Sequence, residues 1–567
     1  MIASAPEVVE DHIRRSTELA RERELWKPLW QDITDYVLPR RSFWDIEATS
    51  GQVPATKCYD GTAIGDLQLL VDGMQGNLVS PAFPWMRLVM EDRRLQVLPG
   101  VADYLEGVEE IFLAYYQRTA FYEAMNEFLM DLASIGTAVM LVDDDITNRS
   151  IIFSTRHMKE CYIAENRNGQ VDVLYRVYTM PNRQIVETWP QAVDDRRREA
   201  AKTNPFTKGH ILHAVFPSRD QSFRTQRDPR HPYSSIYIDV DMKTPLDEGG
   251  YETFPYLVGR WRKNSDEVYG RSPAADAIQD ILRVNQMAMH LLQSAQMASM
   301  PPLMVPEALR GKERLVPQGY NYYSNPDEKI ETIDVSRNYP IARDQEEAVR
   351  QQIHEIFRAK IFLLLQQLEH GPYTATEIRQ RVAEQAAVLG AIIGRFNSEV
   401  LVPLVRRSFL ILKANGALPA PPPQLQGRIK VELQGPLAQA QRRTHQSQGV
   451  DAGLELLERL VKLSPDGMDN VDDDELYRIG MDSAGMPQRI IREIPDREMR
   501  RKRRADMLAK QQAAQSAAVE DAQIIQNTDS LNQPVKQGSM LEQIAKQAAA
   551  RRGATTGAPQ GAVPGAA

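Results

Sequence analysis

The sequence has few cysteines, no long apolar run and no excess of basic residues. Its 567 residues include only Cys58 and Cys161, which excludes a disulfide scaffold and favours a reducing compartment. No apolar run approaches the roughly 18 residues of a membrane span, and the start lacks a secretory signal, so no membrane partner is expected. The formal net charge of −8 argues against coating nucleic acid through bulk charge.

Signatures of catalysis are missing as well. The chain contains no GxxxxGK[ST], GxGxxG, GxSxG or HExxH motif. His210 and His213 lie in a strand-like run and are expected to be solvated or core histidines rather than metal ligands. Asp143–Asp145 follow an apolar run, and we interpret them as a charged hairpin turn before Asn148. We therefore expect no enzyme, no catalytic residue, no cofactor and no metal site.

The pattern of apolar residues predicts mainly α-helix with a smaller antiparallel β portion, an α+β fold. The length gives a prior of about four domains. The expected helices are 7–38, 61–79 and 101–136. Between about 138 and 262, short β-rich runs alternate with turn residues. The expected strands are 151–155, 171–178, 184–189 and 235–240.

Two long helices joined by a small insert form the most informative region. Ser272 and Pro273 form a good helix start, and the first helix can extend to Met300. One of its sides carries a polar, weakly charged stripe. The stripe consists of Gln279, Arg283, Gln286, His290 and Gln293. The second helix is expected at 343–368, with a Pro- and Tyr-rich insert at 301–342.

The remainder of the chain is divided by turn signals. A break at 369–373 precedes a Thr-Ala-Thr-Glu capping box at 374–377. The helix that begins there is expected to reach Ala414 with a kink at Pro403. Residues 415–510 are expected to form a compact, mostly helical unit. Residues 511–567 are rich in Gln and Ala and then in Gly and Pro, and they lack the apolar residues needed for a core.

Four segments in this order carry a resemblance to a known family. They are Gly249–Tyr256, Tyr269-Gly-Arg-Ser-Pro273, Pro301–Pro306 and Thr374–Ile378. Together they resemble the portal protein, or head-to-tail connector, of short-tailed, podovirus-like bacteriophages, over roughly residues 7 to 510. No single motif is specific, but the four in this order and spacing are.

The resemblance implies a portal fold with four named parts. The wing would be 1–271, the stem 272–300 and 343–368, the clip 301–342 and the crown 415–510. A tunnel loop would be 369–373, and 374–414 would be a return helix of the wing. The tail, 511–567, would be a helical barrel or disordered.

The same resemblance implies a ring, with probably twelve subunits, at one capsid vertex. Double-stranded DNA would pass through its central channel during packaging and ejection. Implied partners are the terminase large subunit, a tail adaptor or head completion protein, and the major capsid and scaffolding proteins. The location would be the virion, after assembly in the host bacterial cytoplasm.

Candidate functional residues fall into three sets. Channel and DNA-contact candidates are Glu369, His370, Gly371, Pro372, Tyr373, Gln279, Arg283, Gln286 and His290. Clip docking candidates are Arg310, Lys312, Arg314, Tyr320, Tyr322 and Tyr323. The crown basic cluster is Arg500, Arg501, Lys502, Arg503 and Arg504. The alternatives are a helical minor structural or scaffold protein without a channel, and a metal-dependent nuclease that uses Asp143–Asp145.

Overall fold

The computed structural model describes most of the chain. The described ranges are 6–41, 58–92, 100–219, 231–300, 339–358, 390–423, 429–433 and 494–529, with short pieces between 303 and 332 and after 542. The chain divides into two units, residues 1–96 with 100–486, and residues 97–99 with 487–567. In the described part of the chain, no helix has the length and apolar character that a membrane span requires.

Two of the expected helices are each divided in two. The first is α1 (Pro6–Glu24) and α2 (Lys27–Tyr36), followed by a short 3₁₀ turn at Pro39–Arg41. Pro28 lies in the first turn of α2, where its missing N–H costs nothing, and the chain turns at Leu25 and Trp26 just before it. The pattern over 101–136 is α5 (Val101–Arg118) and α6 (Phe121–Ser134). The helix expected at 61–79 is α3 (Thr62–Leu78).

The β portion consists mainly of two antiparallel sheets. One has the order β3-β2-β9, from Ser150–Arg156, Thr137–Asp145 and Tyr256–Arg260. The other has the order β4-β5-β6-β7-β8, from Cys161–Glu165, Val171–Pro181, Lys208–Pro217, Tyr233–Asp239 and Thr244–Tyr251. The mixture of helix and antiparallel sheet is the one expected from the sequence.

One predicted strand is wrong. Residues 184–189 lie almost entirely in a helix, α7 (Asn182–Thr188), which precedes α8 (Asp195–Thr203). Asn182 and Ile185 are buried, and Trp189 is half-buried, so the inward positions recur at helical spacing. Over so short a run, apolar periodicity does not separate a strand from a helix.

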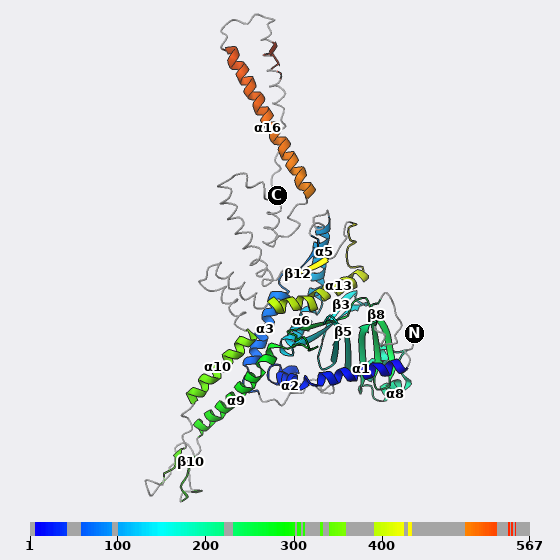
Figure 1. The fold of residues 1–567 in the computed structure, drawn as a ribbon, viewed down its shortest axis with the longest axis vertical. Coiled ribbons are helices and arrows are strands. Elements are labelled where there is room, and N and C mark those ends of the chain that lie inside the picture. The colour runs from blue at the N-terminus through cyan, green and yellow to red at the C-terminus, as the bar shows by residue number, and fades with distance from the viewer. Residues whose placement is uncertain are drawn as a thin grey trace, which may run out of the picture. The chain divides into compact units, whose positions relative to one another are not determined.

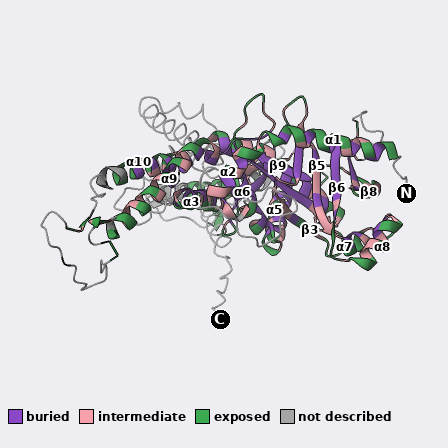
Figure 2. Ribbon diagram, turned by 90° about the horizontal axis from the view of Figure 1, so that it is seen from below, coloured by how far each residue is buried: buried purple, intermediate pink, exposed green. Residues whose placement is uncertain are grey.

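Helices cover both faces of the five-stranded sheet. Val9 and Leu19 of α1 pack with Leu212, whereas Ile185 of α7 packs with Ile211 on the other face. Successive residues of a strand point to opposite faces, so neighbouring residues of β6 enter different cores. Figure 2 shows the buried residues concentrated in this region.

Two long helices leave the body of the first unit side by side. They are α9 (Pro273–Ser299) and α10 (Tyr339–Phe357), with the short strands β10 (Leu303–Met304) and β11 (Glu331–Thr332) beyond their far ends (Figure 1). The bounds of α9 agree with those expected to within one residue at each end. The other helix, α10, begins before the expected residue 343. It ends at Phe357, where Arg358 has a φ of +57°, so the prediction of one continuous helix to 368 is wrong.

The expected kink near Pro403 takes the form of a π-helical stretch. Residues Asn397–Leu401 are π-helical, and α13 (Val402–Ala414) follows. Because Pro403 has no amide hydrogen, it cannot bond to the carbonyl of Glu399. A single turn with wider spacing accommodates that missing bond.

The range 415–510 contains a strand that the sequence reading missed. Residues Ile429–Leu433 form β12, which pairs antiparallel with β1 (Met86–Met90). The Ile-Lys-Val-Glu-Leu sequence alternates apolar and charged residues, which is a strand signal. A segment expected to belong to the crown therefore pairs with a strand of the range expected to be the wing.

The second unit contains the long helix α16 (Ile494–Asp529). It crosses residue 511, where we expected the boundary between a helical unit and the tail. At about 1.5 Å per residue, its 36 residues form a rod of about 54 Å. From Met499 to Ala517 every side chain is exposed, and these side chains include the apolar Met499, Met507 and Leu508 on either side of the basic run.

Candidate functional site

The exposed stripe of α9 is the first feature of the candidate site, which is the α9–α10 hairpin and its attachment to the body. Gln279, Arg283, Gln286 and His290 are all exposed. Their spacing of four, three and four residues places them on one helical face. The structure thus places these four residues on one exposed side of α9, and their contact with DNA stays a prediction.

The far part of α9 carries no formal charge. From Val284 to Met300 there is no Asp, Glu, Lys or Arg. The last arginine before this stretch, Arg283, lies 3.0 Å from the Asp280 carboxylate and donates to Gln352 of α10 at 3.2 Å. The stripe is therefore polar and nearly neutral.

The apolar face of α9 is buried only near the body. Ile278 and Ile281 are buried, as expected, whereas Leu292 and Met300 are exposed, Met300 to 85%. Two side chains of the predicted apolar face thus have no cover within the described part of the chain.

The start of α9 is fixed by the Tyr269–Pro273 motif. The Ser272 hydroxyl accepts from the Ala275 amide at 3.0 Å and donates to the Ser134 carbonyl at 2.5 Å. Gly270 lies against Gly136, whose φ is +94°, and a Cβ on either glycine would overlap the carbonyl oxygen of the other. Both positions therefore require glycine, because backbone cannot move aside as a flexible side chain can.

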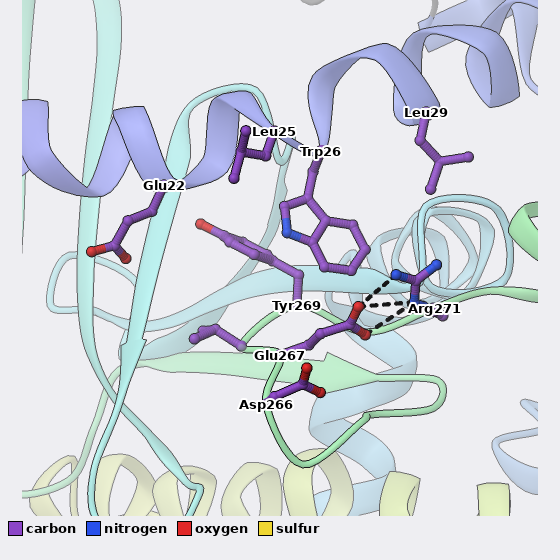
Figure 3. A pocket seen from close by; sticks show the side chains of 9 residues that line it. Glu22, Leu25, Trp26, Leu29, Asp266, Glu267, Tyr269 and Arg271 are labelled. Carbon is purple, nitrogen blue, oxygen red and sulfur yellow. Dashed lines mark hydrogen bonds and ion pairs between the residues drawn. The ribbon is translucent and has the colours of Figure 1, made fainter.

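Aromatic packing supports the same motif. The buried ring of Tyr269 meets Trp30 edge-on, with ring centroids 5.3 Å apart. It also lies beside Trp26, as Figure 3 shows, with ring centroids 6.0 Å apart. Burial raises the pKa of the Tyr269 phenol well above its usual value, so the phenol is neutral. Arg271 pairs with Glu267 at 2.5 Å. The motif is thus an anchor where α9 begins.

A polar clamp connects both long helices to the segment before α3. The Asn285 side-chain oxygen of α9 accepts from the amides of Tyr59 and Asp60, at 2.7 and 3.3 Å. The Asp60 carboxylate in turn accepts from Arg350 of α10 at 2.8 and 2.9 Å, and Arg350 also binds Glu346 at 2.6 Å. Although burial alone would raise it, hydrogen bonds from Thr62 and Arg350 hold the pKa of Asp60 below its usual value.

A second link lies one helical turn farther along α10. His354 Nδ1 lies 2.7 Å from the Asp66 carboxylate of α3. Burial raises the pKa of Asp66, and the nearby His354 opposes that shift. With Asn285 and Arg350, this contact fixes the base of the hairpin at several points.

A further ion-pair network holds the π-helical stretch to the sheets. Arg260 of β9 binds Glu165 of β4 and, at 2.6 Å, Glu399 of the π-helix. Lys263 binds the second oxygen of Glu165 at 2.7 Å. The widened turn before Pro403 thus places a carboxylate beside a buried arginine.

The acidic cluster Asp143–Asp145 has structural partners. Asp143 pairs with Arg407 at 3.3 Å, Asp144 accepts from Asn415 at 2.8 Å, and Asp145 accepts from Asn148. These residues form the paired end of β2, and the turn into β3 follows at 146–149, so the hairpin is present but the acidic residues lie in its strand rather than in its turn. Within the described ranges, no group of three or more His, Cys, Asp or Glu residues is arranged to hold a metal ion.

The two histidines of β6 point to different environments. His210 pairs with Asp241 at 3.1 Å, whereas His213 is buried and bonds to the Tyr256 hydroxyl at 2.7 Å. Burial lowers the pKa of His213 to about 3, so it stays neutral. They are not a metal pair.

The other candidate residues are only partly described. Arg310 and Tyr322 are exposed in the insert, and the cluster Arg500–Arg504 is exposed on α16. Lys312, Arg314, Tyr320 and Tyr323 lie outside the described residues. So do all five candidates of the expected tunnel loop, 369–373.

Sequence reasoning missed the residues that anchor the hairpin. A polar Asn285 among the apolar positions of α9 was a usable signal, because buried polar side chains need partners. Asp60, Asp66 and Gly136 gave no such signal, since their partners lie far away in the sequence.

Comparisons with known proteins agree with the resemblance. A family model described as "Bacteriophage head to tail connecting protein" matches residues 10–491. A "Probable portal protein" of Bordetella phage BPP-1 is 29% identical over 89% of this chain and 92% of its own length. A "Portal protein" of Salmonella phage epsilon15 is 25% identical over 89% of this chain and 94% of its own. A solved structure titled "Neck of empty GTA particle computed with C6 symmetry" covers 69% of this chain and 86% of its own, at 10% identity and a TM-score of 0.32.

Proposed function

This chain belongs to the family of bacteriophage head-to-tail connecting proteins, and from that premise we propose that it forms a closed portal ring at one capsid vertex. The ring, of about twelve subunits, surrounds a channel for double-stranded DNA during packaging and ejection. The family is one of structural connectors, and the comparisons do not favour a channel-free scaffold or a nuclease.

The nearly neutral stripe of α9 carries the proposal for the channel. A surface that neutralises many phosphates with Lys and Arg releases counterions and binds DNA tightly. The Gln279–His290 stripe offers hydrogen-bonding groups with one arginine, which Asp280 already neutralises. Such a wall lets DNA slide.

The exposed apolar residues support the ring. Leu292 and Met300 lie on a helix whose base is fixed, so cover is expected from a neighbouring subunit. In a closed ring each subunit presents one face to the next, and every such residue is then buried.

The remaining parts receive roles from family membership. The insert 301–342, with exposed Arg310 and Tyr322, is the proposed docking surface for the terminase large subunit and then for the tail adaptor or head completion protein. Residues 369–373 are the proposed tunnel loop. The basic cluster Arg500–Arg504 is the proposed contact with packaged DNA, and the major capsid and scaffolding proteins are further proposed partners of the ring.

Electron microscopy and DNA packaging together test this function. Purified wild-type protein should form closed rings. The double variant Gln279→Lys, Gln286→Lys should still form rings but should slow DNA translocation, because each ring then carries two added circles of positive charge.

Gln184→Lys with Gln191→Lys is the matched control, since both residues are exposed and together take the same two charges away from the hairpin. Monomeric wild-type protein contradicts the ring. Translocation by the double variant at the wild-type rate contradicts the channel-lining role of α9.

A further inference from the structure

A surface pocket lies where the α1–α2 corner meets the loop that leads into α9. It has a volume of about 380 Å³ and is lined by Glu22, Leu25, Trp26, Leu29 and residues of 266–271. Figure 3 shows the Trp26 and Tyr269 rings between carboxylates from both segments. The pocket is separate from the stripe of α9.

The carboxylates of the pocket exceed its cations. Glu267 is paired with Arg271 at 2.5 Å. Glu22 and Asp266 are exposed, and within the described part of the chain neither forms a hydrogen bond or an ion pair. The pocket therefore has two carboxylates available to a positively charged partner.

The Trp26 ring and the nearby leucines of the pocket are suited to a basic side chain that has an apolar residue beside it. The Arg271 guanidinium lies 5.1 Å from the centre of the Trp26 ring while it binds Glu267. The Trp26 indole and the Glu267 carboxylate thus bind the same guanidinium, which shows that this pocket can hold a cation. Leu25 is 85% exposed at the rim, and Leu29 is half-buried beside it.

We propose that this pocket is a docking site for a segment of another protein of the particle that presents an arginine or lysine next to an apolar residue. The proposal rests on the proposed function, which supplies the particle. Charge complementarity selects the partner, because the two unpaired carboxylates repel nucleic acid and attract a cationic side chain.

The basic side chain enters between Trp26 and the free carboxylates Glu22 and Asp266. The neighbouring apolar side chain covers Leu25. Burial of the exposed Leu25 side chain favours binding, and the carboxylates of Glu22 and Asp266 make the pocket selective for a cation.

Charge reversal tests the pocket. The double variant Glu22→Lys, Asp266→Lys should form normal rings by electron microscopy. Its incorporation into particles, measured by quantitative immunoblot, should fall by about tenfold, and the neutral pair Glu22→Gln, Asp266→Asn should fall by less. Glu123→Lys with Glu187→Lys is the control, because both residues are exposed on other helices.

A photo-crosslinking benzoylphenylalanine in place of Leu25 identifies the partner directly. The peptide crosslinked in assembled particles should come from another protein and should hold an arginine or lysine beside an apolar residue. A peptide without a basic residue, or one from a second copy of this chain, overturns the proposal.

The two proposals fail differently. Absence of wild-type rings refutes the proposed function. Normal rings with unchanged incorporation of the charge-reversed variant refute the pocket alone. Loss of rings in that variant shows that a second copy occupies the pocket, which also overturns the proposal.

Discussion

Replacing Arg350 by methionine should loosen the attachment of the α9–α10 hairpin to the body. The guanidinium holds the carboxylates of Asp60 and Glu346, whose side chains are almost fully buried. Methionine keeps the length and helix propensity of the side chain but leaves both carboxylates without their cation.

The expected cost follows from burial. Breaking a fully buried ion pair by removing one partner costs about 3–5 kcal/mol. Arg350 is 33% exposed, so solvent screens part of the interaction. A loss of about 2 kcal/mol is the resulting expectation. Because Arg350 helps to keep the pKa of Asp60 low, the variant should lose less stability than the wild type when Asp60 is protonated on acidification, so the difference between the two proteins should narrow at low pH.

Hydrogen exchange followed by mass spectrometry measures this effect locally. At about 2 kcal/mol, the protection of amides near Tyr59 and Asp60 should fall by about 30-fold if exchange follows opening of the clamp.

The matched control is Glu347→Gln. Glu347 is 57% exposed and lies 3.9 Å from the same guanidinium, so its removal should cost less than about 0.5 kcal/mol. Equal protection in the two variants would refute the clamp as the attachment of the hairpin.

Three further substitutions test other contacts. Gly136→Ala should lower the free energy of unfolding by at least about 3 kcal/mol, through backbone strain and overlap with Gly270. The control Gly65→Ala should be neutral or stabilising, because the space around Gly65 is open. Equal melting temperatures of the two variants would contradict this. Asn285→Leu should cost about 1–3 kcal/mol by leaving backbone amides unpaired, seen as faster hydrogen exchange at 59–60, and unchanged exchange would contradict it. Burial raises the pKa of Glu109 to about 7, so the stability of the wild type should fall as the pH rises from about 4.5 to 7. Over the same pH range Glu109→Gln should become more stable than the wild type by up to about 2 kcal/mol. Parallel pH profiles of the two proteins would contradict this.

Local signals predicted the parts of the fold that are locally determined. Ser272 and Pro273 specify the start of α9 by capping chemistry, and the structure begins the helix at Pro273. The strand expected at 235–240 corresponds to β7, which extends from Tyr233 to Asp239. In both cases the decisive residues are neighbours in the sequence.

The predictions failed where distant partners decide the structure. The pairing of β12 with β1 joins residues about 340 positions apart, and α7 is a helix because Ile185 packs against β6. The network around Arg260 joins positions 165, 260 and 399. A charge pattern in one sequence does not specify which of many acidic residues an arginine will meet.

The two parts of α9 show why an anchored but neutral rod suits a conduit. From Pro273 to Asn285 the helix has a cap, buried isoleucines and the clamp, so this end cannot move freely. Beyond Asn285 it has no formal charge up to Met300. If the same face carried lysines, every subunit would add phosphate contacts, and the slope of affinity against salt would steepen by about 0.9 for each contact. Under the proposed function, a rod held firmly at its base and free of such contacts along its length would guide DNA by shape rather than by binding, as both packaging and ejection require.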